Sequence, residues 1–345
     1  NFTLDGRFAF FLKGKIAGST LLTASYDSEK SEEERLFRDI RPDEFYPVYG
    51  ETSLKGYDAQ SSGRLYIRLD HNKTYAVYGD FITQERDQDR QLGDYSRAQT
   101  GIKTHFENEI LKATAFGSQS YSSRLVREFS GQGISRYELP DEEIVINSEI
   151  IEILVYDRDQ QDVLLSSTRL TRFKDYAIEP FTGTLVFSEA ISSVDENFNP
   201  VVIRATYEVE NGGDKYLIGG ADVSVSPIDG LEIGAGIVQD QNPEDNFNLT
   251  SVNAGYSIGK NTKIVIEGAQ TITDSKGTGQ AGRVEIQHKN NLANVRLQVG
   301  RSDKDFANRS TTLSSGKTEA KVKGRLKLGN SSSLNTEALY SRNDT

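Results

Sequence analysis

The sequence predicts an all-β protein: an antiparallel transmembrane β-barrel segment of about 14 strands with a small inserted β-domain. Three observations support this prediction. Apolar and polar residues alternate over segments long enough to cross a bilayer, such segments recur along most of the chain, and the connections between them are sorted by length. Together these features are typical of a barrel with lipid outside and water within.

The alternation is clearest between residues 317 and 328. One side of this segment carries Ala320, Val322, Gly324, Leu326 and Leu328, and the other carries Glu319, Lys321, Lys323, Arg325 and Lys327. Because successive side chains of a strand point to opposite faces, the segment has one apolar and one charged face. Its length is close to the roughly 9–11 residues of a strand that crosses a bilayer.

Similar segments occur in pairs on either side of short polar turns. The clearest pair joins residues 282–290 to residues 291–300. The other pairs are 65–69 with 75–81, 102–106 with 111–117, 217–225 with 231–237, 252–258 with 264–272, and 326–328 with 334–340. Residues 2–12 open the chain with the same alternation. The pattern predicts a series of β-hairpins.

The connections alternate between short turns and long polar links. The long links are residues 27–63, 82–96, 239–248, 273–279 and 302–316. Outer-membrane barrels have short periplasmic turns and long extracellular loops, and every predicted pair obeys this rule. A soluble β-sandwich has no reason to sort its loops so strictly, so the pattern favours a barrel.

One connection is too long to be a loop. Residues 128–210 carry short β-branched runs and a turn at Thr182 and Gly183, over a length that suffices for a small domain. The predicted organisation is therefore barrel strands with long extracellular loops in residues 1–127, an inserted β-domain in 128–210 and further barrel strands in 211–345. The order of short and long connections places the inserted domain on the extracellular side.

Composition excludes several classes of protein. The 345 residues are 36 % hydrophobic with a mean hydropathy of −0.55, which is too polar for a helical membrane protein. The net charge of −11 argues against nucleic acid as a partner. Without Cys the chain forms neither disulfides nor thiolate metal sites. The absence of Met indicates a processed or excised segment. The chain starts inside strand-like sequence at Phe2 and ends as YSRNDT, without the terminal aromatic common in outer-membrane barrels, so we expect further strands in the intact barrel.

Four stretches resemble a known family: YPVYG at 46–50, YDAQSSGRLYIRLD at 57–70, YAVYGDF at 75–81 and DYAIEPFTGTLVF at 175–187. They resemble the very large surface proteins of Gram-negative bacteria that join tandem immunoglobulin-like or cell-surface repeats to an outer-membrane β-barrel. The last stretch is also similar to segments of the giant barrel of the type 9 secretion translocon. The resemblance implies a barrel at the cell surface and supplies no catalytic residues.

The sequence predicts no catalytic, cofactor-binding or metal site. His71, His105 and His288 lie far apart. The acidic residues of 157–162 lack the spacing of an EF-hand loop. The glycine-rich run 277–282 is not followed by the Lys and Ser or Thr of a phosphate-binding loop. We therefore expect a protein that is not an enzyme and needs no cofactor.

The constellation that invites a functional interpretation is a basic wall. Six basic residues fall on the charged faces of neighbouring strands and would line the lumen: Arg283, Arg296, Lys321, Lys323, Arg325 and Lys327. The residues expected to face lipid are Val295, Leu297, Val299, Val322, Leu326 and Leu328. The basic side chains either keep the lumen wet or pair with acidic partners, or they provide a path for anions or a docking face for an acidic plug.

The predicted function is that of the barrel-forming portion of a large bacterial outer-membrane surface protein, which acts as a membrane anchor or conduit. Its location would be the outer membrane, with the loops and the inserted domain outside the cell. Its expected partners are outer-membrane lipid and other envelope or surface proteins. The alternative is a soluble or fibre-forming β-rich adhesin, in which the alternation reflects one packed and one wet sheet face.

Overall fold

The computed structural model describes residues 8–28, 46–47, 57–58, 64–83, 90–142, 144–145, 148–160, 164–172, 174–210, 215–308, 310–311, 315–328 and 332–343. Within these ranges the chain consists of strands, turns and irregular links, and no helix there is long and apolar enough to cross a membrane. Residues 2–7 of the predicted opening strand and most of the link 27–63 lie outside the described ranges.

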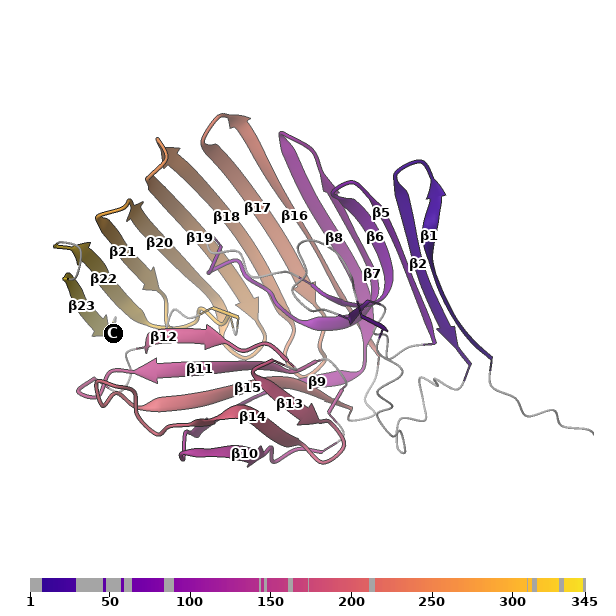
Figure 1. Cartoon of the computed structure of the whole chain (residues 1–345), viewed down its shortest axis with the longest axis horizontal. Helices are drawn as coiled ribbons and strands as arrows, with labels where there is room; N and C mark the ends of the chain where they lie inside the picture. Colours follow the sequence, from indigo (N-terminus) through magenta and orange to yellow (C-terminus); the bar gives the residue numbers. More distant parts are fainter. Residues whose placement is uncertain are drawn as a thin grey trace, which may run out of the picture.

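A single antiparallel sheet of 14 strands dominates the structure and confirms the predicted fold class (Figure 1). Its strands in spatial order are β1 (Ala9–Ala17), β2 (Thr20–Asp27), β5 (Leu65–His71), β6 (Thr74–Ile82), β7 (Ala98–Glu107), β8 (Leu111–Ser120), β16 (Tyr216–Ile228), β17 (Leu231–Asp240), β18 (Phe247–Ile258), β19 (Thr262–Thr273), β20 (Gly277–Lys289), β21 (Ala293–Ser302), β22 (Lys317–Lys327) and β23 (Ser333–Asn343). Strands β1 and β23 are the two edges, so the described sheet is open. A separate pair joins β3 (Tyr46–Pro47) to β4 (Tyr57–Asp58).

Short turns and long links gather at opposite ends of the strands (Figure 1). Hydrogen bonds connect successive turns at the short-turn end, where Ser257 N donates to Gly230 O and Lys289 N to Asn261 O, each at 2.8 Å. Glycines allow these tight reversals, since Gly230 and Gly259 both have a positive φ. The short turns and long links that the sequence predicts to alternate along the chain are therefore separated to opposite ends of the sheet.

The large sheet has two faces of opposite character. On the face that we call outer, large apolar side chains are exposed, for example Ile237 (57 %), Val252 (58 %) and Ile266 (55 %). On the inner face, charged side chains are buried, among them Glu267 and Glu285. This distribution is the reverse of the pattern in a soluble protein, where apolar groups are buried and charges face water.

Two smaller sheets form the segment between β8 and β16, which we call the insert. The first contains β9 (Ser122–Ser130), β11 (Ile150–Tyr156), β12 (Leu164–Arg169) and β15 (Val201–Glu210) in the order β12-β11-β15-β9. The second contains β10 (Ile134–Glu138), β13 (Tyr176–Glu179) and β14 (Thr184–Ile191) in the order β10-β14-β13. Strand β9 begins at Ser122, upstream of the boundary expected at residue 128.

The insert has a hydrophobic core of its own. Ile151, Leu185, Ile203 and Tyr207 are fully buried between its two sheets. The stretch 175–187, which carries part of the family resemblance, forms the hairpin of β13 and β14, in which Gly183 adopts a φ of +67°. The insert lies along the long-link end of the large sheet (Figure 1).

Candidate functional site: the inner face and its covering loop

A loop from the link between β6 and β7 lies against the inner face. We call residues Arg90–Arg97 the covering loop. Its Leu92 and Tyr95 are buried in a cluster with Ile218, Leu249 and Phe306, which brings together the large sheet, the covering loop and the link after β21. Burial of these two side chains fixes the loop on the sheet through the hydrophobic effect.

The covering loop is closed at its base. Thr83 N donates to Arg97 O and Arg97 N donates to Thr83 Oγ1, both at 2.9 Å, while Thr83 Oγ1 donates to Tyr95 O at 2.6 Å. These bonds pin the two ends of the link together where it leaves β6 and returns to β7. The loop is thus anchored at its base as well as through its apolar side chains.

A buried carboxylate holds the middle of the covering loop. Three consecutive backbone N–H groups, those of Gln91, Leu92 and Gly93, donate to Glu267 on β19 at 2.9, 2.8 and 2.8 Å. Such a row of N–H groups forms a concave anion-binding site, and hydrogen bonds to a charged acceptor are stronger than neutral ones. Glycine is needed at position 93, because a Cβ there would lie 2.3 Å from Ser251 Oγ.

The same carboxylate begins a chain of ion pairs along the sheet. Arg283 Nε lies 2.9 Å from Glu267 Oε2, and Arg283 NH1 lies 2.6 Å from Glu285 Oε2. Arg296 Nε continues the chain at 2.7 Å from Glu285 Oε1. The side chains of Glu267, Arg283 and Glu285 are at most 1 % exposed. Full pairing of this kind is what allows charges to be buried.

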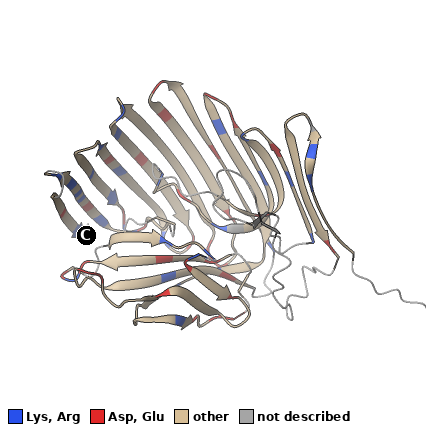
Figure 2. Ribbon diagram, viewed as in Figure 1, with Lys and Arg blue, Asp and Glu red and all other residues tan. Residues whose placement is uncertain are grey.

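The pairing register places the predicted wall residues on two faces. The residues on the inner face are Arg283, Arg296, Lys321, Lys323, Arg325 and Lys327, and those on the outer face are Val295, Leu297, Val299, Val322 and Leu326. Leu328 follows the end of β22 and is not part of the paired register. Acidic as well as basic residues lie on these strands (Figure 2), and the register puts Glu285 and Glu319 on the inner face, which is therefore mixed in charge. Besides the Arg283 and Arg296 pairs, Lys321 Nζ lies 2.9 Å from Glu319 and Lys323 Nζ lies 3.6 Å from Glu337. Of the functions considered for the basic side chains, pairing with acidic partners agrees with these contacts.

Arg97 joins the covering loop, the large sheet and the insert. Its guanidinium is 2 % exposed and donates through Nε to Glu208 of β15, through NH1 to Asp240 of β17 at 2.8 Å, and through NH2 to the Tyr216 hydroxyl of β16 at 2.9 Å. Burial alone would lower the pKa of Arg97, but the Glu208 and Asp240 carboxylates raise it well above its ordinary value. Arg97 is therefore a buried cation that links the covering loop to the insert and the large sheet, with partners 111 and 143 residues away in sequence.

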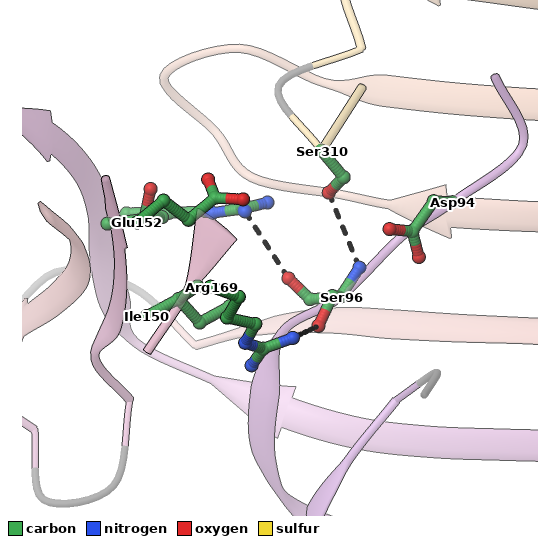
Figure 3. Close-up of a pocket in the computed structure, with 8 residues that line it drawn as sticks. Asp94, Ser96, Ile150, Glu152, Arg169 and Ser310 are labelled. Carbon is green, nitrogen blue, oxygen red and sulfur yellow. Dashed lines mark hydrogen bonds between the residues drawn. The ribbon is translucent and has the colours of Figure 1, made fainter. Parts of the chain in front are cut away.

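A small pocket lies where the covering loop meets the insert (Figure 3). At its centre Ser96 uses each of its polar groups. Its N donates to Ser310 Oγ, while its O and Oγ accept hydrogen bonds from Arg124 and Arg169 of the insert, each at 3.3 Å. Nearby, Asn308 Nδ2 donates to Leu92 O and Asp94 O at 2.7 and 2.9 Å. The covering loop is thus held from three sides.

The covering loop lies against the inner face through apolar contacts, hydrogen bonds and ion pairs. No group of three or more His, Asp or Glu within the described ranges could hold a metal ion. His105 stacks on Tyr75 at 5.2 Å and bonds to Thr114, which is a structural role. All but the last residue of the covering loop falls in the link 82–96, which the sequence predicts to be a long polar loop outside the cell. The available signal was Leu92 and Tyr95, two large apolar residues in an otherwise polar stretch.

No protein-family model and no curated protein matches the chain. Among solved structures the chain is similar to OccD3 (OpdP) of Pseudomonas aeruginosa, at 10 % sequence identity and a TM-score of 0.41. The match covers 93 % of this chain and 61 % of that chain. It is also similar to OccAB2 of Acinetobacter baumannii, at 12 % identity over 97 % of this chain and 74 % of that chain, with a TM-score of 0.36. A third similar structure is OmpT, an outer membrane protein of Vibrio cholerae, at 10 % identity over 97 % of this chain and 86 % of that chain, with a TM-score of 0.30. The chain spans about three fifths of the length of OccD3.

Proposed function

We propose that the chain forms part of the wall of a bacterial outer-membrane β-barrel, and that the covering loop and insert occlude the interior of this barrel. The observation that carries the proposal is the reversed burial of the two faces. Apolar side chains are exposed from β1, at Phe10 (43 %), to β23, at Tyr340 (57 %), while the inner face buries Glu267, Arg283 and Glu285.

Lipid is the solvent that fits the outer face. In water, a contiguous apolar surface of this extent marks a site of interaction or a risk of aggregation. Ile286, Leu297 and Val322 occupy directly paired positions on β20, β21 and β22, so the apolar surface runs on from strand to strand. A soluble adhesin would have packed this face against a second sheet.

The open edges imply further strands. Strands β1 and β23 each have one partner in the described sheet, yet apolar side chains continue to both. An unpaired edge is not tolerated in the hydrocarbon region, because each unsatisfied backbone group costs several kcal/mol there. The complete barrel therefore closes through strands additional to these 14.

The orientation follows from the connections. With the short turns in the periplasm, the long links and the insert face the outside of the cell. The barrel then serves a larger surface protein as a membrane anchor or as a plugged conduit, with outer-membrane lipid and envelope or surface proteins as partners. An association with tandem immunoglobulin-like repeats stays a prediction from the sequence resemblance.

Two measurements test the proposal. The purified protein should need detergent to stay monodisperse. On a denaturing gel, an unheated sample should migrate faster than a heated one. In planar bilayers it should give little conductance until the covering loop is displaced. A monodisperse protein without detergent would support the adhesin instead.

A further inference from the structure

We infer that the insert is a latch for the covering loop, and that the ion pair between Glu208 and Arg97 couples the position of the insert to that of the loop. A partner or ligand that moves the insert would thereby release the loop from the inner face. The coupling itself rests only on the contacts described here. The further step, that release of the loop opens a path through the barrel, rests on the proposed function.

Three strands of the insert converge on two residues of the covering loop. Arg124 of β9 and Arg169 of β12 donate to Ser96, and Glu208 of β15 accepts from Arg97. Since β9, β15 and β12 belong to one four-stranded sheet, a movement of that sheet as a unit acts on all three contacts together.

Glu208 also holds the base of the loop in place. Its carboxylate accepts hydrogen bonds from Ser122 Oγ and from Nε2 of Gln99, the latter at 3.1 Å. Gln99 lies near the start of β7, directly after the loop. Glu208 is 3 % exposed, so its charge depends on these partners and on Arg97 for compensation. The carboxylate therefore lies where the insert, the loop base and β7 meet.

The two sides of the covering loop differ in kind. Towards the large sheet the loop buries Leu92 and Tyr95 in an apolar cluster and also donates three N–H groups to Glu267. Towards the insert, the contacts of Ser96 and Arg97 are hydrogen bonds and an ion pair. Among the described residues, the insert side lacks the apolar burial that holds the loop on the large sheet, so it is the side that can open while the loop stays attached to the sheet until further contacts break.

The insert has other contacts that bypass the covering loop, one with the large sheet and one with the link between β17 and β18. Lys321 Nζ on β22 donates to Leu164 O at 2.9 Å, and Ser123 Oγ donates to Glu244 at 3.2 Å. These contacts allow the insert to stay on the barrel when the contact between Glu208 and Arg97 is broken. The latch can thus be tested without removing the insert.

The test is hydrogen exchange of the full-length protein in detergent, read at the amides of Gln91, Leu92 and Gly93. We expect Glu208→Gln to speed exchange at these amides by roughly tenfold or more, because loop opening becomes easier. The matched control is Glu128→Gln, which removes the ion pair between Glu128 and Arg204 within the insert, away from the loop. Equal loop exchange in the two variants would overturn the inference.

A second pair of variants covers a failure of the insert to fold. If Glu208→Gln also exposes the amides of Ile151 and Ile203 in the insert core, the deciding variant becomes Arg169→Gln, which removes a contact to Ser96. Its control is Arg158→Gln on an exposed turn. Faster loop exchange in Arg169→Gln supports the latch and unchanged exchange refutes it. Faster loop exchange with no gain in bilayer conductance would uphold the latch and refute the conduit.

Discussion

Glu267 and Arg283 face each other as cross-strand partners of β19 and β20, with both side chains 1 % exposed. The pair does two things at once. It neutralises a basic side chain inside the sheet, and it offers the remaining acceptor capacity of Glu267 to three N–H groups of the covering loop. Arg283, which the sequence pattern assigns to a basic wall, therefore supports the carboxylate that holds the covering loop.

Replacing Glu267 by Gln should destabilise both the sheet and the loop. Removing one partner of a buried ion pair typically costs about 3–5 kcal/mol, and we expect the lower end because Arg283 keeps Glu285. The measurement is the urea midpoint in detergent, together with the temperature at which the unheated gel form is lost. The control is Glu337→Gln, whose pair with Lys323 is exposed and should contribute about 0–1 kcal/mol. Equal losses in the two variants would contradict the assigned role of Glu267.

Adding one methyl group at Gly93 should unseat the covering loop. A Cβ at this position would meet Ser251 Oγ at 2.3 Å and Ser251 Cβ at 2.5 Å, so Gly93→Ala must push the loop away at a cost of about 1–3 kcal/mol. Faster exchange of the Leu92 amide is the expected result, and a second change, Ser251→Gly, should restore its protection. Gly117→Ala, where a Cβ meets nothing within 4 Å, is the control and should leave the Leu92 amide unchanged.

The outer face should not tolerate charge. Val322 lies between Leu297 and Ala338 on that face, so Val322→Arg should cost about 2–4 kcal/mol if the site lies near the bilayer midplane. Lys323→Ala, one residue along on the inner face, should be mild because Lys323 is exposed. Assembly in native membranes, followed by the heat-dependent gel shift, distinguishes the two. Greater damage from the Lys323 change would mean that the two faces have been exchanged.

The strand plan was predictable because it depends on local pattern. The alternation in residues 282–300 predicts β20 and β21, and the sorting of connections by length is preserved in space. Strand β2 is not among the predicted hairpins, since the adjacent Leu21 and Leu22 break its alternation. An alternating apolar and polar pattern does not reveal such a strand, and only its hydrogen bonding to β1 and β5 in the structure identifies it.

The site was only partly predictable, because its contacts join distant parts of the sequence. The bonds from Gln91, Leu92 and Gly93 to Glu267 span more than 170 residues. The acidic partners of the basic wall were nevertheless visible, since Glu285 alternates in step with Arg283 and Glu319 in step with Lys321. Counting both signs of charge on that face would have predicted a paired wall.

The insert should fold by itself as a soluble β-domain. Residues 122–210 contain a hydrophobic core of their own, in which Ile151, Leu185 and Ile203 are fully buried. Expressed alone without detergent, this segment should give dispersed amide signals and a cooperative unfolding transition. Aggregation or an unfolded spectrum would mean that the insert depends on its contacts with the large sheet, such as the bond from Lys321 Nζ to Leu164 O.

Acid should weaken the insert through Asp141. A hydrogen bond from Arg127, whose Nε lies 2.9 Å from Asp141 Oδ2, and another from Tyr207 hold the pKa of Asp141 below its ordinary value of 3.8. A lowered pKa in the folded state contributes stability that is fully present above pH 3.8 and is lost as the pH falls through the folded value. Asp141→Asn should therefore be less stable than the parent at pH 7, and the difference should shrink below pH 3.8. Urea midpoints of the insert between pH 3 and pH 7 measure it, and Asp159→Asn on an exposed turn serves as the control. A constant difference between parent and Asp141→Asn across this range would show that the stabilisation does not come from the ionised carboxylate.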